Sequence, residues 1–195
     1  MLNSLMKGVS VAVALAMSPF ALAAQDSIVI GEINHYKRMA AFANPYKNGI
    51  VMATEEFNAA GGVLGKPLEF IFRDDQGAPG EAVKIAEELM TRDKAVMLTG
   101  TIFSHVGLAI SSLAAEKGYV YLAAEPLADA LVWAKGNDYT FRLRASTYMQ
   151  SAMLAEQAVA SGAKKFATIA PNYAYGKDAV AAFKKAVHAL DPEVE

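Results

Sequence analysis

Short apolar runs alternate along the chain with segments whose apolar residues recur at helical spacing. Residues 27–31 form the first apolar run, and Ile50, Ala53 and Phe57 then predict a helix over 47–60 that ends at Gly61 and Gly62. The same alternation predicts further strands over 67–72, 95–98, 119–123 and 139–143, and helices that begin at Pro79, Ser104 and Pro126. Alternation at this spacing is typical of βαβ units, so we predict an α/β fold with a doubly wound parallel sheet.

The pattern changes after residue 143. A longer helix is predicted over 146–161, a sixth strand over 164–170 and an amphipathic helix over 177–190. One strand and two helices cover little apolar surface by themselves. We therefore expect residues 24–143 to form a first, incomplete lobe and residues 144–195 to be the truncated start of a second lobe.

The first two dozen residues have the pattern of a cleaved signal peptide. Lys7 supplies a positive charge, residues 9–17 are mostly apolar, and residues 21–23 read Ala-Leu-Ala, an A-x-A cleavage pattern. A membrane-spanning helix would need about 20 apolar residues without the break at Ser18 and Pro19. We predict a signal peptide over 1–23 and a mature chain in a bacterial periplasm, without membrane insertion. Because the chain has no cysteine, it is not expected to be a lipoprotein.

Composition narrows the classes of partner. The 195 residues are 54% hydrophobic and carry 18 basic against 20 acidic side chains, a formal net charge of -2. Nucleic acid or an anionic membrane surface would require a basic patch, so neither is expected as a partner. The absence of cysteine also excludes disulfides, thiolate metal sites and cysteine nucleophiles.

Candidate binding residues follow the predicted strands, because ligands of open α/β sheets bind beyond the carboxyl ends of the strands. Ser104 follows a strand and opens a helix, so its hydroxyl and the nearby amides could hold a carboxylate; the alternative is a plain N-cap worth ~1 kcal/mol. Glu125 precedes Pro126 and could accept hydrogen bonds from an ammonium or amide group, or it could stabilise a helix dipole. Asp74 and Asp75 could hold a cation, although two acids before a helix more often cap it or face water.

Other chemistry finds little support. No pair of the three histidines (His35, His105, His188) has the spacing of a zinc motif, so no metal site is predicted. Ser104 and His105 are adjacent and lack a G-x-S-x-G elbow, which argues against a hydrolase. The glycines of 61–67 are wrongly spaced for a phosphate loop, and no dinucleotide fingerprint follows the first strand. We expect no enzyme activity and no cofactor.

Aromatic residues gather near the same strand ends. They are Tyr36, Phe42, Phe103, Tyr148, Tyr173 and Tyr175. An aromatic-walled cleft would suit a small organic solute, although tyrosine is also common in loops that bind nothing.

Five segments, in order along the chain, carry a family resemblance. They are FNAAGGVLGKP (57–67), DDQG with Pro79 (74–79), GTIFS (100–104), Phe141-Arg142 and Tyr175-Gly176. Together they make the chain similar to the leucine/isoleucine/valine-binding (branched-chain amino acid) family of periplasmic ABC-transporter solute-binding proteins, which have the type I periplasmic-binding fold.

The resemblance implies a two-lobed protein that closes on its ligand by hinge motion, with the first hinge crossing between 141 and 147. It implies that Ser104 binds the ligand carboxylate and that the 124–127 turn, with Glu125 and Leu127, contacts the ligand. Phe42 would line the cleft from the first loop, and Tyr175 would approach from the second lobe. Phe103 and Tyr148 are expected to bind the ligand as part of the aromatic wall.

The implied function is capture of a small solute for the ABC permease subunits of the inner membrane. A ligand-sensing receptor or regulator of the same fold is the alternative. Residues 34–38, Glu125, Leu127 and Thr147 depart from the pattern of amino-acid binders, so an amino acid, an amide and an aromatic acid all stay open as ligands.

Overall fold

The computed structural model describes residues 27–195. The signal peptide predicted over 1–23 lies outside the described residues. Within 27–195, no helix combines the length and the apolar character that crossing a bilayer requires.

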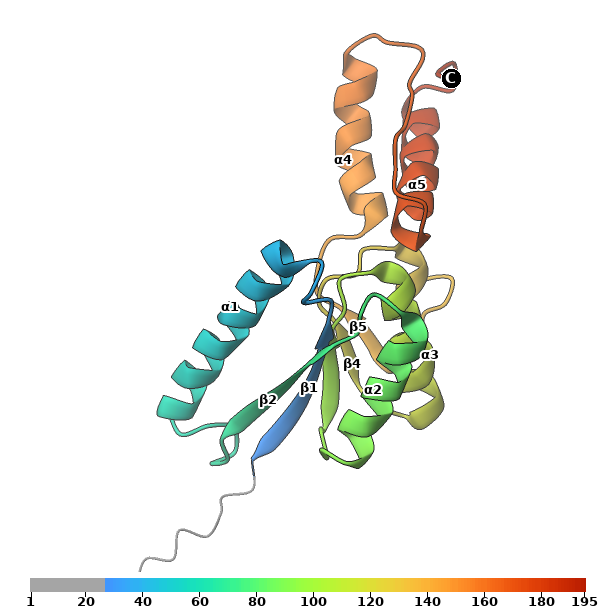
Figure 1. The fold of residues 1–195 in the computed structure, drawn as a ribbon. Helices are drawn as coiled ribbons and strands as arrows, with labels where there is room; N and C mark the ends of the chain where they lie inside the picture. The colour runs from blue at the N-terminus through green and yellow to red at the C-terminus, as the bar shows by residue number, and fades with distance from the viewer. Residues whose placement is uncertain (1–26) are drawn as a thin grey trace, which may run out of the picture.

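A five-stranded parallel sheet forms the first part of the described chain (Figure 1), in the order β2-β1-β3-β4-β5. The strands are β1 (Ile28–Asn34), β2 (Leu68–Asp74), β3 (Met97–Gly100), β4 (Tyr121–Ala123) and β5 (Thr140–Arg142). Each strand pairs in parallel with its neighbours, which places all their carboxyl ends at one edge. The strand order reverses beside β1, as in a doubly wound fold, so the predicted fold class is confirmed.

Helices cover the two faces of the sheet unequally (Figure 1). α2 (Pro79–Thr91) and α3 (Ser104–Lys117) pack together on one face, and α1 (Ala40–Ala59) lies on the other. The face under α2 and α3 holds the main core, which includes fully buried Leu89, Leu98 and Ile110. α3 ends at Gly118, whose φ of 64° suits glycine because a Cβ would be strained there.

α4 (Thr147–Ala160) and α5 (Ala174–Leu190) pack side by side and project away from the sheet (Figure 1). Their small core contains Ala155, Ala186 and Val187, and the rings of Phe166 and Phe183 meet edge to face at 6.1 Å. This arrangement places the start of α5 next to the carboxyl ends of the strands.

Three predicted elements differ in the structure. Residues 164–170 were predicted as a strand, but they form no strand, because within the described residues only the backbone of Glu195 pairs with their first three residues. The predicted helix over 126–133 is only a 3-10 turn, η1 (Asp129–Leu131). The amides of Leu127 and Ala128, just before it, donate to the side chain of Ser104 on α3 instead. α1 begins at Ala40 rather than at residue 47. Pro45 lies inside the helix, where it removes one backbone hydrogen bond but does not end the helix.

Candidate functional site

The carboxyl ends of β1, β3 and β4 meet in a rim of tightly bonded turns. Gly100 and Thr101 both have left-handed φ values, 102° and 59°, and the amide of Thr101 donates to the carbonyl of Ile33 at 2.6 Å. The amide of Ala124 donates to the carbonyl of Gly100 at 3.3 Å. These bonds hold three loops from distant parts of the sequence against one another.

Ser104 connects two of these loops. Phe103, not Ser104, is the N-cap of α3, and no side chain caps the helix. The Ser104 side chain is buried, and its Oγ accepts hydrogen bonds from the amides of Leu127 and Ala128 at 3.3 and 3.2 Å. The alternative of a plain N-cap is therefore wrong, and the hydroxyl fastens the start of α3 to the 124–128 turn. Its contact with a ligand carboxylate stays a prediction. Two accepted bonds leave the hydroxyl proton available for donation.

Glu125 pairs with a residue at the end of β1. The side-chain amide of Asn34 donates to Glu125 Oε2 at 2.6 Å, and both residues are buried. Burial raises the pKa of the Glu125 carboxyl, while the Asn34 hydrogen bond and the charge of Arg144 lower it. The carboxyl group is thus fixed by a residue of β1, two strands away in the sheet, which is more than stabilisation of a helix dipole requires.

Sequence patterns did not single out Glu32, which lies on β1 two residues before Asn34 and is fully buried. Burial raises the pKa of Glu32 to about 8, against hydrogen bonds that lower it, among them the Tyr36 hydroxyl that donates to Oε2 at 2.5 Å. The other oxygen, Oε1, has no hydrogen-bond partner. A charged residue inside an apolar strand run was the signal in the sequence.

Aromatic rings join the rim to the start of α5. The ring of Phe103 lies 5.5 Å from those of His35, His105 and Tyr173, and Tyr173 lies 6.0 Å from Tyr175. Since Tyr173 precedes α5 directly, this cluster spans the two parts of the chain.

The remaining two predicted aromatic residues lie elsewhere. Phe42 is on α1 and is 61% exposed, and Tyr148 packs against Trp133 with their rings 5.9 Å apart. Their contact with a ligand stays a prediction.

A second connection runs through the predicted hinge crossing. The Thr147 hydroxyl lies within hydrogen-bonding reach of Asp129, at 2.9 Å, and of Asp178 on α5. The amide of Asp129 donates to Asp178 Oδ2 at 2.7 Å, and the amide of Thr147 donates to the carbonyl of Leu127 at 2.9 Å. The amide of Tyr148 donates to Asp129 Oδ2 at 2.9 Å. The Thr147 hydroxyl and the amides of Asp129 and Tyr148 therefore hold the Asp129 and Asp178 carboxylates where the sheet meets α4 and α5.

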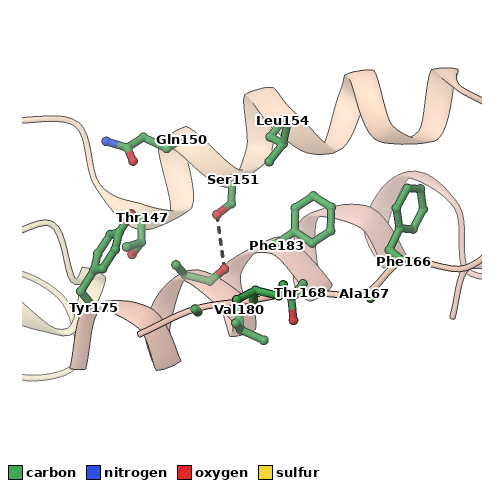
Figure 2. Close-up of a pocket in the computed structure, with 13 residues that line it drawn as sticks. Thr147, Gln150, Ser151, Leu154, Phe166, Ala167, Thr168, Tyr175, Val180 and Phe183 are labelled. Carbon is green, nitrogen blue, oxygen red and sulfur yellow. Dashed lines mark hydrogen bonds between the residues drawn. The ribbon is translucent and has the colours of Figure 1, made fainter. Parts of the chain in front are cut away.

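An apolar groove of about 350 Å³ lies between α4, α5 and residues 166–170 (Figure 2). Leu154, Phe166 and Phe183 line it, and Ser151 Oγ donates across it to the carbonyl of Ala179 at 3.4 Å. Tyr175 lies at one end of the groove, beside Thr147. Tyr175, which was predicted to contact the ligand from the second lobe, thus lies between this groove and the rim.

A parallel sheet whose strand ends carry buried polar groups and lie beside a second helical unit is an arrangement in which α/β proteins commonly bind small molecules. The sequence pattern of the periplasmic binding protein family matches residues 38–195, and the chain belongs to that family. That match confirms the predicted family.

Curated relatives agree with this assignment. Leu/Ile/Val-binding protein homolog 3 of Brucella melitensis is 31% identical over 87% of this chain and 46% of its own length. Leu/Ile/Val-binding protein BraC3 of Rhizobium johnstonii is 28% identical over 90% of this chain and 48% of its own length. The chain thus spans about half the length of the relatives that it matches. Both relatives are Leu/Ile/Val-binding proteins by name.

Solved structures show the same fold. A periplasmic binding protein from Burkholderia mallei superposes with a TM-score of 0.79 at 28% identity, over 85% of this chain and 44% of that one. A solute-binding protein of Rhodopseudomonas palustris in complex with 4-hydroxybenzoate gives 0.76 at 26%, over 85% and 45%. The branched-chain amino acid transporter substrate-binding protein LivJ of Streptococcus pneumoniae, in complex with isoleucine, gives 0.74 at 26%, over 83% and 47%.

Proposed function

We propose that this protein is the periplasmic solute-binding component of an ABC importer, exported by a signal peptide over residues 1–23. It binds a small carboxylate-bearing solute, an amino acid, an amide or an aromatic acid, between the rim of its first lobe and the start of its second. The family and the ligands named for LivJ and for the Rhodopseudomonas protein support this proposal. The permease subunits of the inner membrane are its partners.

The observation that carries the proposal is the start of α3. A helix N-terminus without a side-chain cap presents its first amides and the positive end of its dipole to whatever lies in front of it. The hydroxyl of Ser104 has a proton left to donate at the same place. A ligand carboxylate is the group that these donors fit best.

The surroundings of the α3 start suit the rest of such a ligand. Phe103 and Tyr173 offer ring faces and edges from the two sides of the crossing. Glu125 offers an oxygen acceptor, already oriented by the hydrogen bond from the Asn34 side chain. An organic acid with an apolar body and one further polar group would satisfy both.

Calorimetric titration of the purified protein with leucine, isoleucine, valine, their amides, benzoate and 4-hydroxybenzoate tests binding. We expect one solute to bind with 1:1 stoichiometry and to stabilise the fold by ~2.7 kcal/mol at 100 times its Kd. Ser104→Ala should weaken binding of that solute at least ~10-fold, because it loses a hydrogen bond to a charged group. Ser112→Ala, at an exposed position of the same helix, is the matched control.

Failure of every solute in the panel to bind, or equal effects of the two serine variants, would contradict the proposed site. Uptake of the labelled solute by cells lacking the protein separates import from sensing. Loss of uptake supports the importer, whereas unchanged uptake with intact binding favours the sensing receptor.

A further inference from the structure

Three side chains converge beside the rim where β1 and β2 end. His35 Nδ1 lies 3.4 Å from Asp75 Oδ1 and 3.6 Å from Asp74 Oδ1, and the candidate ligand atoms of the three residues all lie within 4.8 Å of one another. His35 is 4% exposed and Asp75 is 0% exposed, while the side chain of Asp74 is 21% exposed. The cluster is therefore closed on its inner side and reachable from the side of Asp74.

Two atoms of this cluster are buried without any hydrogen-bond partner, namely His35 Nδ1 and Asp75 Oδ2. A buried carboxylate that lacks a compensating charge costs several kcal/mol, because it has lost its hydration. The ring of Phe103 lies over His35 at 5.5 Å and adds to the exclusion of water. The fold thus keeps an imidazole nitrogen and a carboxylate oxygen unsatisfied next to each other.

The spacing fits a metal ion better than a direct ion pair. A charge-assisted N–H···O bond would bring nitrogen and oxygen to about 2.7–2.9 Å, well inside the observed separations. Ligand atoms at about 2.0–2.1 Å from a tetrahedral ion lie roughly 3.3–3.4 Å from each other. This is close to the 3.4 and 3.6 Å that separate His35 Nδ1 from the Asp75 and Asp74 oxygens. One imidazole and two carboxylates form a donor set that Zn²⁺ accepts.

Backbone amides already orient both carboxylates. Asp75 Oδ1 accepts from the amide of Gly77 at 2.7 Å, and Asp74 accepts from the amides of Gln76 and Lys37 at 2.8 and 3.1 Å. In metal sites, hydrogen bonds of this kind orient the carboxylates that bind the ion.

We propose that His35, Asp74 and Asp75 bind a divalent transition-metal ion of the Zn²⁺ class, which fastens the loop after β1 to the loop after β2. The site stands on these three side chains alone and does not depend on which solute the protein binds.

Competition between the metal-stripped protein and a chromophoric chelator for Zn²⁺ tests the proposal. We expect one ion per chain and a Tm about 5–10 °C higher at a free Zn²⁺ concentration of 100 times Kd. His35→Gln and Asp75→Asn should each weaken Zn²⁺ binding at least ~10-fold, since even the loss of a group that supports a metal ligand costs that much. His188→Gln, an exposed histidine on α5, should leave the affinity unchanged.

Since His35 and Asp75 are buried, their variants are compared with the wild type by circular dichroism and melting in chelator. Asp74→Asn, at the accessible edge, gives an independent variant with little risk to folding. Weaker Zn²⁺ binding by Asp74→Asn with an unchanged chelator-treated Tm supports the site. A stoichiometry near zero, or an affinity that neither His35→Gln nor Asp74→Asn alters, overturns it.

Discussion

Glu32 should make the stability of the protein fall between pH 5 and pH 8. Its pKa is raised from an ordinary value of 4.5 to about 8, chiefly because the carboxyl group is buried. The folded protein therefore holds a proton in this interval that the unfolded chain releases. The stabilisation is complete below pH 4.5, decreases as pH rises, and is lost above about pH 8.

The magnitude follows from the two pKa values. At 1.36 kcal/mol per pH unit, the interval corresponds to an upper bound of about 5 kcal/mol between the protonated and the ionised carboxyl. Glu32→Gln keeps the shape and the acceptor for the Tyr36 hydroxyl but has no proton to lose. Its new amide group stands where Oε1 has no partner, so at pH 5 the variant should be about 1–2 kcal/mol less stable than the wild type.

Urea unfolding from pH 5 to pH 9, with chelator present, checks this expectation. The difference in unfolding free energy between Glu32→Gln and the wild type should change sign as pH rises, leaving the variant more stable above pH 8. Glu69→Gln, an exposed glutamate on the neighbouring strand β2, should show no such crossing. Parallel pH curves for the wild type and Glu32→Gln would refute the assignment of a protonated carboxyl.

Three further substitutions test the packing and the connections of the site. Leu89→Ala, in the fully buried core under α2, should cost about 2–5 kcal/mol in urea unfolding. Gly100→Ala places a Cβ 2.4 Å from a β1 carbonyl at a φ of 102°, so it should lower stability by more than about 2 kcal/mol and distort the rim. Thr147→Val removes the hydroxyl between the Asp129 and Asp178 carboxylates and should cost about 1–3 kcal/mol, whereas Thr91→Val at an exposed position should be nearly neutral by melting.

The architecture of the sheet could be predicted because it depends on periodicity that the chain carries locally. Every strand of the sheet was expected within two residues or so of its observed start, and α2 begins at Pro79 as predicted. The prediction of a strand over 164–170 was wrong, because strand formation depends on backbone elsewhere in the chain. A strand exists only if neighbouring backbone satisfies its hydrogen bonds, and the composition of a segment does not say whether such a neighbour is present.

The roles of single side chains were harder to predict, because burial and orientation are set by residues far away in the sequence. A cap of its own helix was the alternative considered for Ser104, yet its hydroxyl accepts from amides more than twenty residues later. Glu32 was not predicted as a site residue, since its raised pKa arises only when folding buries the carboxyl group in the sheet beside Tyr36.

The histidine and aspartate cluster shows what strand register adds to a motif search. A search for histidine pairs cannot find it, because its ligands come from two strands that lie about forty residues apart. In the parallel register of β1 and β2, Asn34 stands opposite Asp74, so the residues that follow, His35 and Asp75, leave the sheet at the same edge. The strand register and the buried atoms without hydrogen-bond partners together indicate a candidate cation site in these two loops. Changing either aspartate should therefore affect Zn²⁺ binding, although neither lies in a recognisable metal motif.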